Sequence, residues 1–174
     1  MHSPNSRNFR TFADVEKTAE DAFALRSQSI FEEIAQSSVI SIAAVHGAAV
    51  AGGCELALAC DLRVIGPKAY FALPEVSLGL IPSAGGCTRL SSLIGASRSK
   101  AVILGGDTIT AQHALDWGLA NRLTDTPYDT ALKWAEQINQ SPHLALRLAK
   151  RVLTAPNLAK ERLCEAILYR QKNS

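Results

Sequence analysis

The sequence predicts an α/β fold in which short buried strands alternate with helices. A nearly unbroken apolar run at 39–45 is typical of a strand that is covered on both faces. Residues 13–36 instead carry apolar positions at helical spacing, which indicates a long amphipathic helix. The chain has 174 residues, 47% of them hydrophobic and 20% charged, which suits one globular domain with an aliphatic core.

Glycine and proline turns separate the elements that follow this helix. In chain order we expect a strand at 39–45, a helix at 54–60, strands at 62–65 and 70–72, and a loop at 74–86. The helix follows the pair Gly52-Gly53 and consists of good helix formers. Because the loop is rich in glycine and proline and sits between periodic segments, it is a candidate binding surface.

The rest of the chain is mostly helical in pattern. We expect helices at 87–94, 97–104, 110–117, 128–139, 142–154 and 158–169, with one strand at 119–123. Thr110 fits an N-cap and Gly118 a C-cap glycine. These expectations divide the chain into an N-terminal loop and helix at 1–36, a core at 37–125 and a helical region at 126–174.

Composition and charge exclude several classes of function. A net charge of +2 and an aromatic content of 6% favour neither nucleic acid nor an anionic membrane as a partner. The chain lacks the apolar run of about 18 residues that a membrane span needs, and a signal peptide is not expected. We read residues 1–12 as a loop, with the edge of a mitochondrial presequence as the alternative. The chain is therefore expected to be soluble and intracellular.

The four cysteines and four histidines do not suggest a metal site or a disulfide framework. The cysteines show no CxxC spacing, and we expect them to be buried free thiols in a reducing compartment. The histidines are scattered without ligand spacing. His46 reads as a structural histidine and Asp61 as a residue of the turn between a helix and a strand.

Two carboxylates next to glycine-rich segments are the candidate catalytic residues. Glycines at a helix N-terminus expose backbone N–H groups that stabilise negative charge, and Gly52-Gly53 occupy that place. Glu55 lies one turn into the same apolar helix, where a lone carboxylate is costly unless it is paired or used. Glu75 precedes the glycine-rich loop. The structural alternatives are that Glu55 caps the N–H groups of its own helix and that Glu75 is solvated.

Together, the two glutamates and the helix N-terminus supply the groups for acid/base chemistry beside an enolate. Spacing alone leaves open whether Glu55 and Glu75 meet. The motifs GxSxG, GxxxxGK[ST], HExxH and GxGxxG do not occur, so hydrolase, NTPase, zinc-protease and dinucleotide-binding functions are not favoured.

Three segments carry a resemblance to a known family: IAAVHGAAVAGGCELALACDLRV (Ile42–Val64), FALPEVSLGLIPSAGG (Phe71–Gly86) with TRL (Thr88–Leu90), and GASRSKAVILGGDTITAQHALDWGLANRL (Gly95–Leu123). Over residues 27–155 the chain resembles the enoyl-CoA hydratase/isomerase family, the crotonase superfamily. The resemblance implies a spiral of β-β-α units with a C-terminal helical region, incomplete at the N-terminus. It also implies that Gly52 donates an oxyanion-hole N–H and that Glu55 and Glu75 are the catalytic acids. Substrate-binding positions carried over in the same way are Ala51, Leu78, Pro82, Ser83 and Gly85.

By this resemblance the chain is expected to hydrate 2-enoyl-CoA thioesters in fatty-acid or branched-chain acyl-CoA breakdown. No metal or redox cofactor is implied, because coenzyme A belongs to the substrate. A homo-trimer or hexamer in the cytoplasm or the mitochondrial matrix is the implied assembly and compartment. A double-bond isomerase of the same superfamily is the enzymatic alternative.

The sequence also departs from the family pattern. Ala51 replaces the first glycine of a GGG triplet and Ser83 the first glycine of PGAGG. The GAD-type motif that supplies the second oxyanion donor is missing, and the last helices look incomplete. We therefore expect the chain to be a fragment or short variant, and an inactive subunit that binds full-length relatives is the non-enzymatic alternative.

Overall fold

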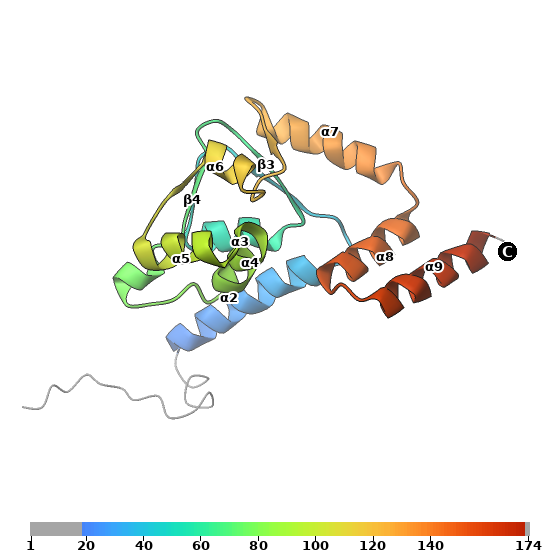
Figure 1. The fold of residues 1–174 in the computed structure, drawn as a ribbon, viewed down its shortest axis with the longest axis horizontal. Helices are drawn as coiled ribbons and strands as arrows, with labels where there is room; N and C mark the ends of the chain where they lie inside the picture. Colours follow the sequence, from blue (N-terminus) through green and yellow to red (C-terminus); the bar gives the residue numbers. More distant parts are fainter. Residues whose placement is uncertain (1–18, 173–174) are drawn as a thin grey trace, which may run out of the picture.

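The computed structural model describes residues 19–172, in which the strands form two small sheets (Figure 1). The first sheet contains β1 (Ile42–Val45), β3 (Leu62–Ile65) and β6 (Arg122–Leu123), all parallel. The second contains β2 (Ala48–Val50), β4 (Tyr70–Ala72) and β5 (Ile109–Thr110), with β2 and β4 parallel and β5 antiparallel to β4. This arrangement confirms the predicted α/β fold.

The chain repeats one path through the two sheets. Each of its first two turns places a strand in the first sheet, crosses to a strand in the second, and then enters a helix. The two turns are in register, since Ile42 lies opposite Leu62 and Ala48 opposite Tyr70. A repeated β-β-α unit of this kind is the spiral that the resemblance implies.

The helices lie close to their predicted positions. They are α2 (Ala19–Gln36), α3 (Gly52–Ala59), α4 (Gly86–Ile94), α5 (Ala96–Gly105), α6 (Ala111–Asp116), α7 (Pro127–Asn139), α8 (His143–Thr154) and α9 (Leu158–Lys172), with a 3₁₀ turn η1 (Glu75–Leu78). The Thr110 hydroxyl accepts the N–H of His113 at 3.2 Å, which confirms the N-cap of α6. Gly118 follows this helix with a φ of 77°, as a C-cap glycine does. Residues 13–18 of the predicted first helix lie outside the described residues.

The strands differ more from the prediction. β2 and β5 were not expected, and their segments are only three and two residues long. The first strand begins at Ile42 instead of residue 39, and only Arg122–Leu123 of the predicted strand at 119–123 pairs. Short segments of this kind owe their pairing to tertiary contacts, which leave little periodic signal in the sequence.

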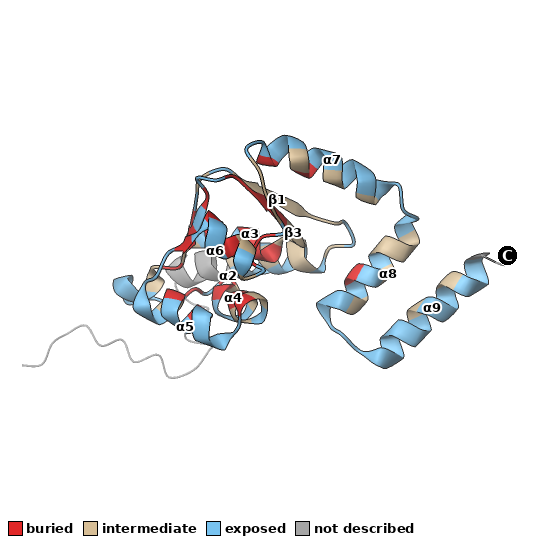
Figure 2. Cartoon of the chain, turned by 45° about the horizontal axis from the view of Figure 1, so that its top comes forward, coloured by how far each residue is buried: buried red, intermediate tan, exposed pale blue. Residues whose placement is uncertain are grey.

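The core lies between the sheets and the helices α3 to α6. Its largest fully buried side chains are Phe71, Ile65, Leu73, Leu90, Ile109 and Leu119. Buried residues concentrate around the strands, α3 and α4, whereas α8 and α9 extend away from them and are mostly exposed (Figure 2). The exposed apolar residues of this helical arm include Leu153, Leu158, Leu163 and Tyr169.

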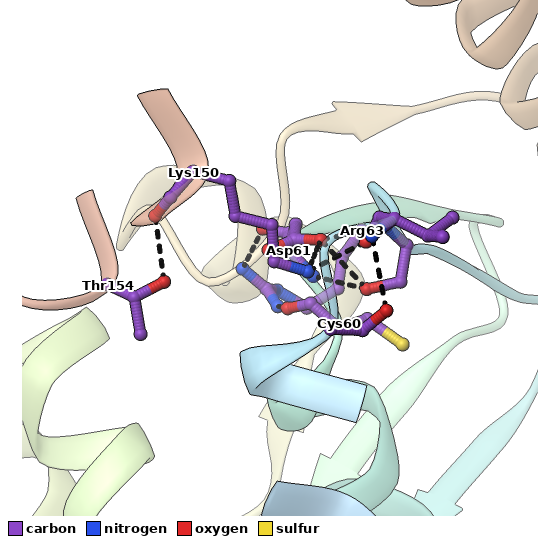
Figure 3. Close-up of polar contacts among 8 residues, drawn as sticks. Cys60, Asp61, Arg63, Lys150 and Thr154 are labelled. Atoms are coloured by element: carbon purple, nitrogen blue, oxygen red, sulfur yellow. Dashed lines mark hydrogen bonds and ion pairs between the residues drawn. The ribbon is translucent and has the colours of Figure 1, made fainter. Parts of the chain in front are cut away.

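One buried charge ties this arm to the core (Figure 3). The Lys150 ammonium on α8 donates to the Asp61 carboxylate at 2.7 Å and to the Val39 carbonyl at 2.8 Å. Ser41 donates its N–H and its hydroxyl to the same Asp61 oxygen, at 2.7 and 3.0 Å. Asp61 is therefore an ion-pair partner as well as a turn residue.

A second buried cation closes the C-terminal end of α3. The Arg63 guanidinium donates to the carbonyls of Ala57 and Cys60 at 3.1 and 2.7 Å, and also to the carbonyl of Leu119. A positive group at a helix C-terminus satisfies carbonyls that have no partner within the helix. Arg63 thereby anchors the helix whose other end carries the candidate site.

Strand β1 forms one edge of its sheet, because its paired neighbour is β3 on one side alone within the described residues. The carbonyls of Ser41 and Val45 accept N–H groups from the β3 side, at 3.1 and 2.8 Å. Since hydrogen-bonding direction alternates along a strand, Ile42 and Ala44 direct their backbone groups away from β3.

All four cysteines are free thiols. Cys54 is buried and Cys60 and Cys164 are half-buried, but Cys87 is exposed. The expectation of burial is wrong for Cys87, because it lies in the first turn of α4 on the outer side of the helix. Of the helices in residues 19–172, none is long and apolar enough to cross a membrane.

Candidate active site

The site begins at the N-terminus of helix α3. Ala51, which precedes the helix, donates its N–H to the Ala72 carbonyl at 2.9 Å, and its own carbonyl accepts the N–H of Glu55 at 3.0 Å. The first N–H groups of a helix have no acceptor within it, and no hydrogen bond in the described part of the chain uses the N–H of Gly52. Gly52 and Gly53 are exposed, and a Cβ at either would meet nothing within 4 Å. The donor end of α3 therefore faces open space.

The turn into this helix carries backbone strain at Ala51. Its φ of 52° and ψ of −124° lie in a region that residues with a Cβ rarely adopt. Ala51 stands where the family pattern has a glycine, and its side chain makes this backbone conformation less favourable. The helix still begins at Gly52.

Glu55 projects from α3 into a buried position, with 5% of its surface exposed. Its Oε1 accepts the N–H groups of Ala84 and Gly86 at 2.8 and 2.9 Å. The alternative that Glu55 caps its own helix is therefore wrong, because its donors are Ala84, in the glycine-rich loop, and Gly86, the first residue of α4. A Cβ at Gly86 would lie 2.9 Å from this oxygen and 2.7 Å from Pro82 Cβ, so glycine is required there.

Glu75 opens η1 directly after Pro74. Its Oε2 is buried and has no hydrogen-bond partner among the described residues, whereas the residue as a whole is partly buried. Burial raises the pKa of Glu75, and the neighbouring charge of Glu55 raises it further. The structure thus brings the two predicted acids into one electrostatic environment.

Cys54 lies in the same environment, next to Glu55 in sequence. Burial raises the pKa of its thiol to about 12, and the charges of Glu75 and Glu55 add to this effect. Because a thiol must lose its proton to act as a nucleophile, Cys54 is a packing residue at neutral pH. Partial burial and the charges of Glu55 and Glu75 also raise the pKa of Cys87, although most of this residue is exposed.

The other predicted site residues occupy different surroundings. Pro82 is buried, Ala51 and Gly85 are half-buried, and Leu78 and Ser83 are exposed. Pro82 and Gly85 belong to the loop that donates to Glu55. Leu78 is 73% exposed at the end of η1. The assignment of these residues to substrate binding stays a prediction.

Arg89 is a site neighbour that the sequence reasoning did not single out. Its Nη1 donates to the Ala84 carbonyl at 2.7 Å, and its Nη2 forms an ion pair with Glu32 of α2. The Ala84 carbonyl belongs to the same loop that holds Glu55. In the sequence, Arg89 is marked only as the middle residue of the TRL segment, which belongs to the family resemblance.

The arrangement can bind a negatively charged oxygen and move a proton beside it. The open helix N-terminus stabilises an anion, Glu55 has a fixed orientation, and Glu75 holds a proton more strongly than an ordinary carboxyl does. Within residues 19–172, no group of three or more His, Cys, Asp or Glu side chains is placed to hold a metal ion.

Comparisons with known proteins agree with this geometry. The sequence profile of the enoyl-CoA hydratase/isomerase family matches residues 8–173. The chain is 44% identical over 126 residues to a "Probable enoyl-CoA hydratase 2, mitochondrial" of Arabidopsis thaliana, covering 71% of this chain and 42% of the plant protein. It is 37% identical over 155 residues to the 2,3-dehydroadipyl-CoA hydratase of Escherichia coli K12, covering 86% of this chain and 61% of that protein.

Solved structures show the same fold. DspI of Pseudomonas aeruginosa matches with a TM-score of 0.83 at 34% identity, covering 87% of this chain and 67% of that one. An enoyl-CoA hydratase of Bacillus anthracis matches with a TM-score of 0.79 at 32% identity, covering 91% of this chain and 65% of that one. The chain thus spans about half the length of the curated relatives it matches, between 42% and 61% in the two cases above.

Proposed function

Because the chain belongs to the enoyl-CoA hydratase/isomerase family, we propose that it hydrates 2-enoyl-CoA thioesters. The observation that carries the proposal is that Glu55, fixed by two backbone N–H groups, lies on the helix with the open N-terminus, and that its charge raises the pKa of Glu75, whose Oε2 is buried without a partner among the described residues. Hydration needs an anion-stabilising donor for the thioester oxygen and two proton-transfer groups, and these residues supply that set.

In the proposed reaction the Gly52 N–H donates to the thioester carbonyl oxygen, which gains negative charge as the enolate forms. Glu55 accepts a proton from water as the water oxygen bonds to the β-carbon. Glu75 delivers a proton to the α-carbon, and the carbon–carbon π bond is lost. The raised pKa of Glu75 suits it to hold that proton, and the two N–H bonds to Glu55 suit it to orient the water.

The presence of both acids favours hydration over double-bond isomerisation. An isomerase moves one proton along the acyl chain, so a single acid suffices for its chemistry. Here Glu55 is buried and one carboxylate oxygen of Glu75 is buried without a hydrogen-bond partner among the described residues, at a cost in stability that a one-acid mechanism does not explain. The absence of a cofactor requirement, the homo-oligomeric assembly, the pathway and the compartment stay predictions of the resemblance.

Hydration of crotonyl-CoA by the purified 174-residue chain tests the proposal. We expect turnover that Glu75→Gln and Glu55→Gln each lower by about 10²- to 10⁴-fold without changing the circular dichroism spectrum. Near-normal turnover in either variant would remove that residue from the mechanism. A reaction run in ¹⁸O-labelled water separates the two activities, because a hydratase adds the label to the product and an isomerase does not.

A folded but inactive chain would overturn the hydratase proposal for this chain. The alternative, an inactive subunit, requires that the chain form a stable mixed oligomer with a full-length relative. Co-purification with such a relative measures this directly, and a lone monomer would contradict the subunit role as well.

A further inference from the structure

We propose that Arg89 is a positioning residue for Glu55 and acts through the backbone of residues 82–86. Both side chains bond to the backbone of this segment, which comprises the end of the loop and the first residue of α4. Glu55 accepts the N–H groups of Ala84 and Gly86, and Arg89 donates to the carbonyl of Ala84. The effect of Arg89 on turnover rests on the proposed function, whereas its effect on the loop does not.

The backbone at Ala84 links the two charged groups. Its N–H points to the Glu55 carboxylate at 2.8 Å, and its carbonyl accepts from the Arg89 guanidinium at 2.7 Å. A cation on the carbonyl and an anion on the N–H fix the loop from both sides, and hydrogen bonds to charged groups are the stronger kind. Arg89 therefore determines where the two donors of Glu55 lie.

The glycines of the loop allow both side chains to approach closely. A Cβ at Gly85 would lie 1.9 Å from Arg89 Nη1, and Gly85 also has a φ of +102°. A Cβ at Gly86 would lie 2.9 Å from Glu55 Oε1. The two consecutive glycines thus leave room for the guanidinium at Gly85 and for the carboxylate at Gly86.

Glu32 holds the far side of the guanidinium. Its carboxylate on α2 pairs with Arg89 Nη2, while Nη1 is occupied by the loop carbonyl. Glu32 is half-exposed, so it contributes less than the buried contacts do. The pair nevertheless orients the planar guanidinium, and it connects α2 to the loop that serves the candidate site.

Amide NMR of ¹⁵N-labelled protein tests the proposal without relying on activity. In Arg89→Gln we expect the Ala84 and Gly86 amide resonances to move toward their positions in Glu55→Gln. Their hydrogen exchange should become at least about tenfold faster, as expected when a hydrogen bond to a charged group is lost. Arg98→Gln, which removes an arginine that lies over the ring of Trp117 at the C-terminal end of α6, is the matched control and should leave both resonances unchanged.

The kinetic readout is a fall in kcat that exceeds any rise in KM, because Arg89 contacts the backbone that orients Glu55. Arg89→Lys keeps the charge without the two-pronged geometry and should recover only part of the loss. If Arg89→Gln does not fold, Glu32→Gln should move the same two resonances in the same direction by less. Unchanged Ala84 and Gly86 resonances in Arg89→Gln would overturn the proposal. A wild-type chain inactive on crotonyl-CoA would refute the proposed function alone, since the NMR result decides the role of Arg89.

Discussion

Replacing Lys150 with methionine removes the ammonium group that ties α8 to the core. The side chain of Lys150 is 5% exposed and that of Asp61 is 22% exposed, so the change leaves a largely buried carboxylate without its cation. It also removes the hydrogen bond to the Val39 carbonyl. Methionine fills a similar volume, and the lost interactions are therefore electrostatic.

Breaking one side of a buried ion pair costs about 3–5 kcal/mol. We expect the lower end here, about 3 kcal/mol, because Asp61 keeps both donors from Ser41 and some contact with water. For a domain of this size, 1 kcal/mol lowers the Tm by about 2–4 °C, which gives about 6–12 °C for Lys150→Met.

Urea denaturation followed by circular dichroism measures this loss. The exposed Lys133 of α7 provides the matched control, and Lys133→Met should change the free energy of unfolding by less than about 0.5 kcal/mol. In a double-mutant cycle with Asp61→Asn, the double variant should lose clearly less free energy of unfolding than the two single variants lose together. A loss below about 0.5 kcal/mol for Lys150→Met would refute the idea that this pair holds the arm to the core.

Three further predictions follow from backbone strain and titration. Ala51→Gly should raise the free energy of unfolding by about 1 kcal/mol in the same assay, because relief of about 1–3 kcal/mol at positive φ exceeds the entropic cost of glycine. A lower stability for that variant would contradict the strain. Glu75→Gln should be more stable than the wild type at neutral pH, because the raised pKa of Glu75 makes folding less favourable as pH rises from 4.5 through that pKa. The gain should vanish well below pH 4.5, and an equal gain at every pH would exclude titration as its cause. Thiol labelling of the folded chain should modify the exposed Cys87 before the buried Cys54, and the Cys87 rate should keep rising above the usual thiol pKa. Prior labelling of Cys54 would contradict the burial that the structure gives it.

Local signals in the sequence were sufficient for most of the helices. Thr110 and Gly118 mark the ends of α6 by capping chemistry that acts within a few residues. The strand Ala48–Val50 has no such signal, because three small apolar residues fit a strand, a helix or a turn equally well. Its pairing with Tyr70–Ala72 depends on a segment about twenty residues away, which no local pattern encodes.

The candidate site divides in the same way. Glu55 and Glu75 stand out in the sequence because each is a carboxylate in apolar company beside glycines. The hydrogen-bond partners of Glu55 do not stand out in the sequence, because Ala84 and Gly86 donate backbone N–H groups from 29 and 31 residues away. Lys150 and Asp61 are separated by 89 residues, and an exposed lysine has the same sequence pattern as a buried one. Contacts of this kind follow from the fold as a whole.

The open edge of β1 has a consequence for handling the protein. A row of unpaired backbone groups on an apolar strand is a template on which a strand of another chain can add. Ile42 and Ala44 present such a row within the described residues, and neither is charged. The side chains of β1 are also only partly covered. We therefore expect concentrated solutions of the chain to lose material through sheet growth from β1, and expect dilution or a lysine introduced on this strand to reduce the loss.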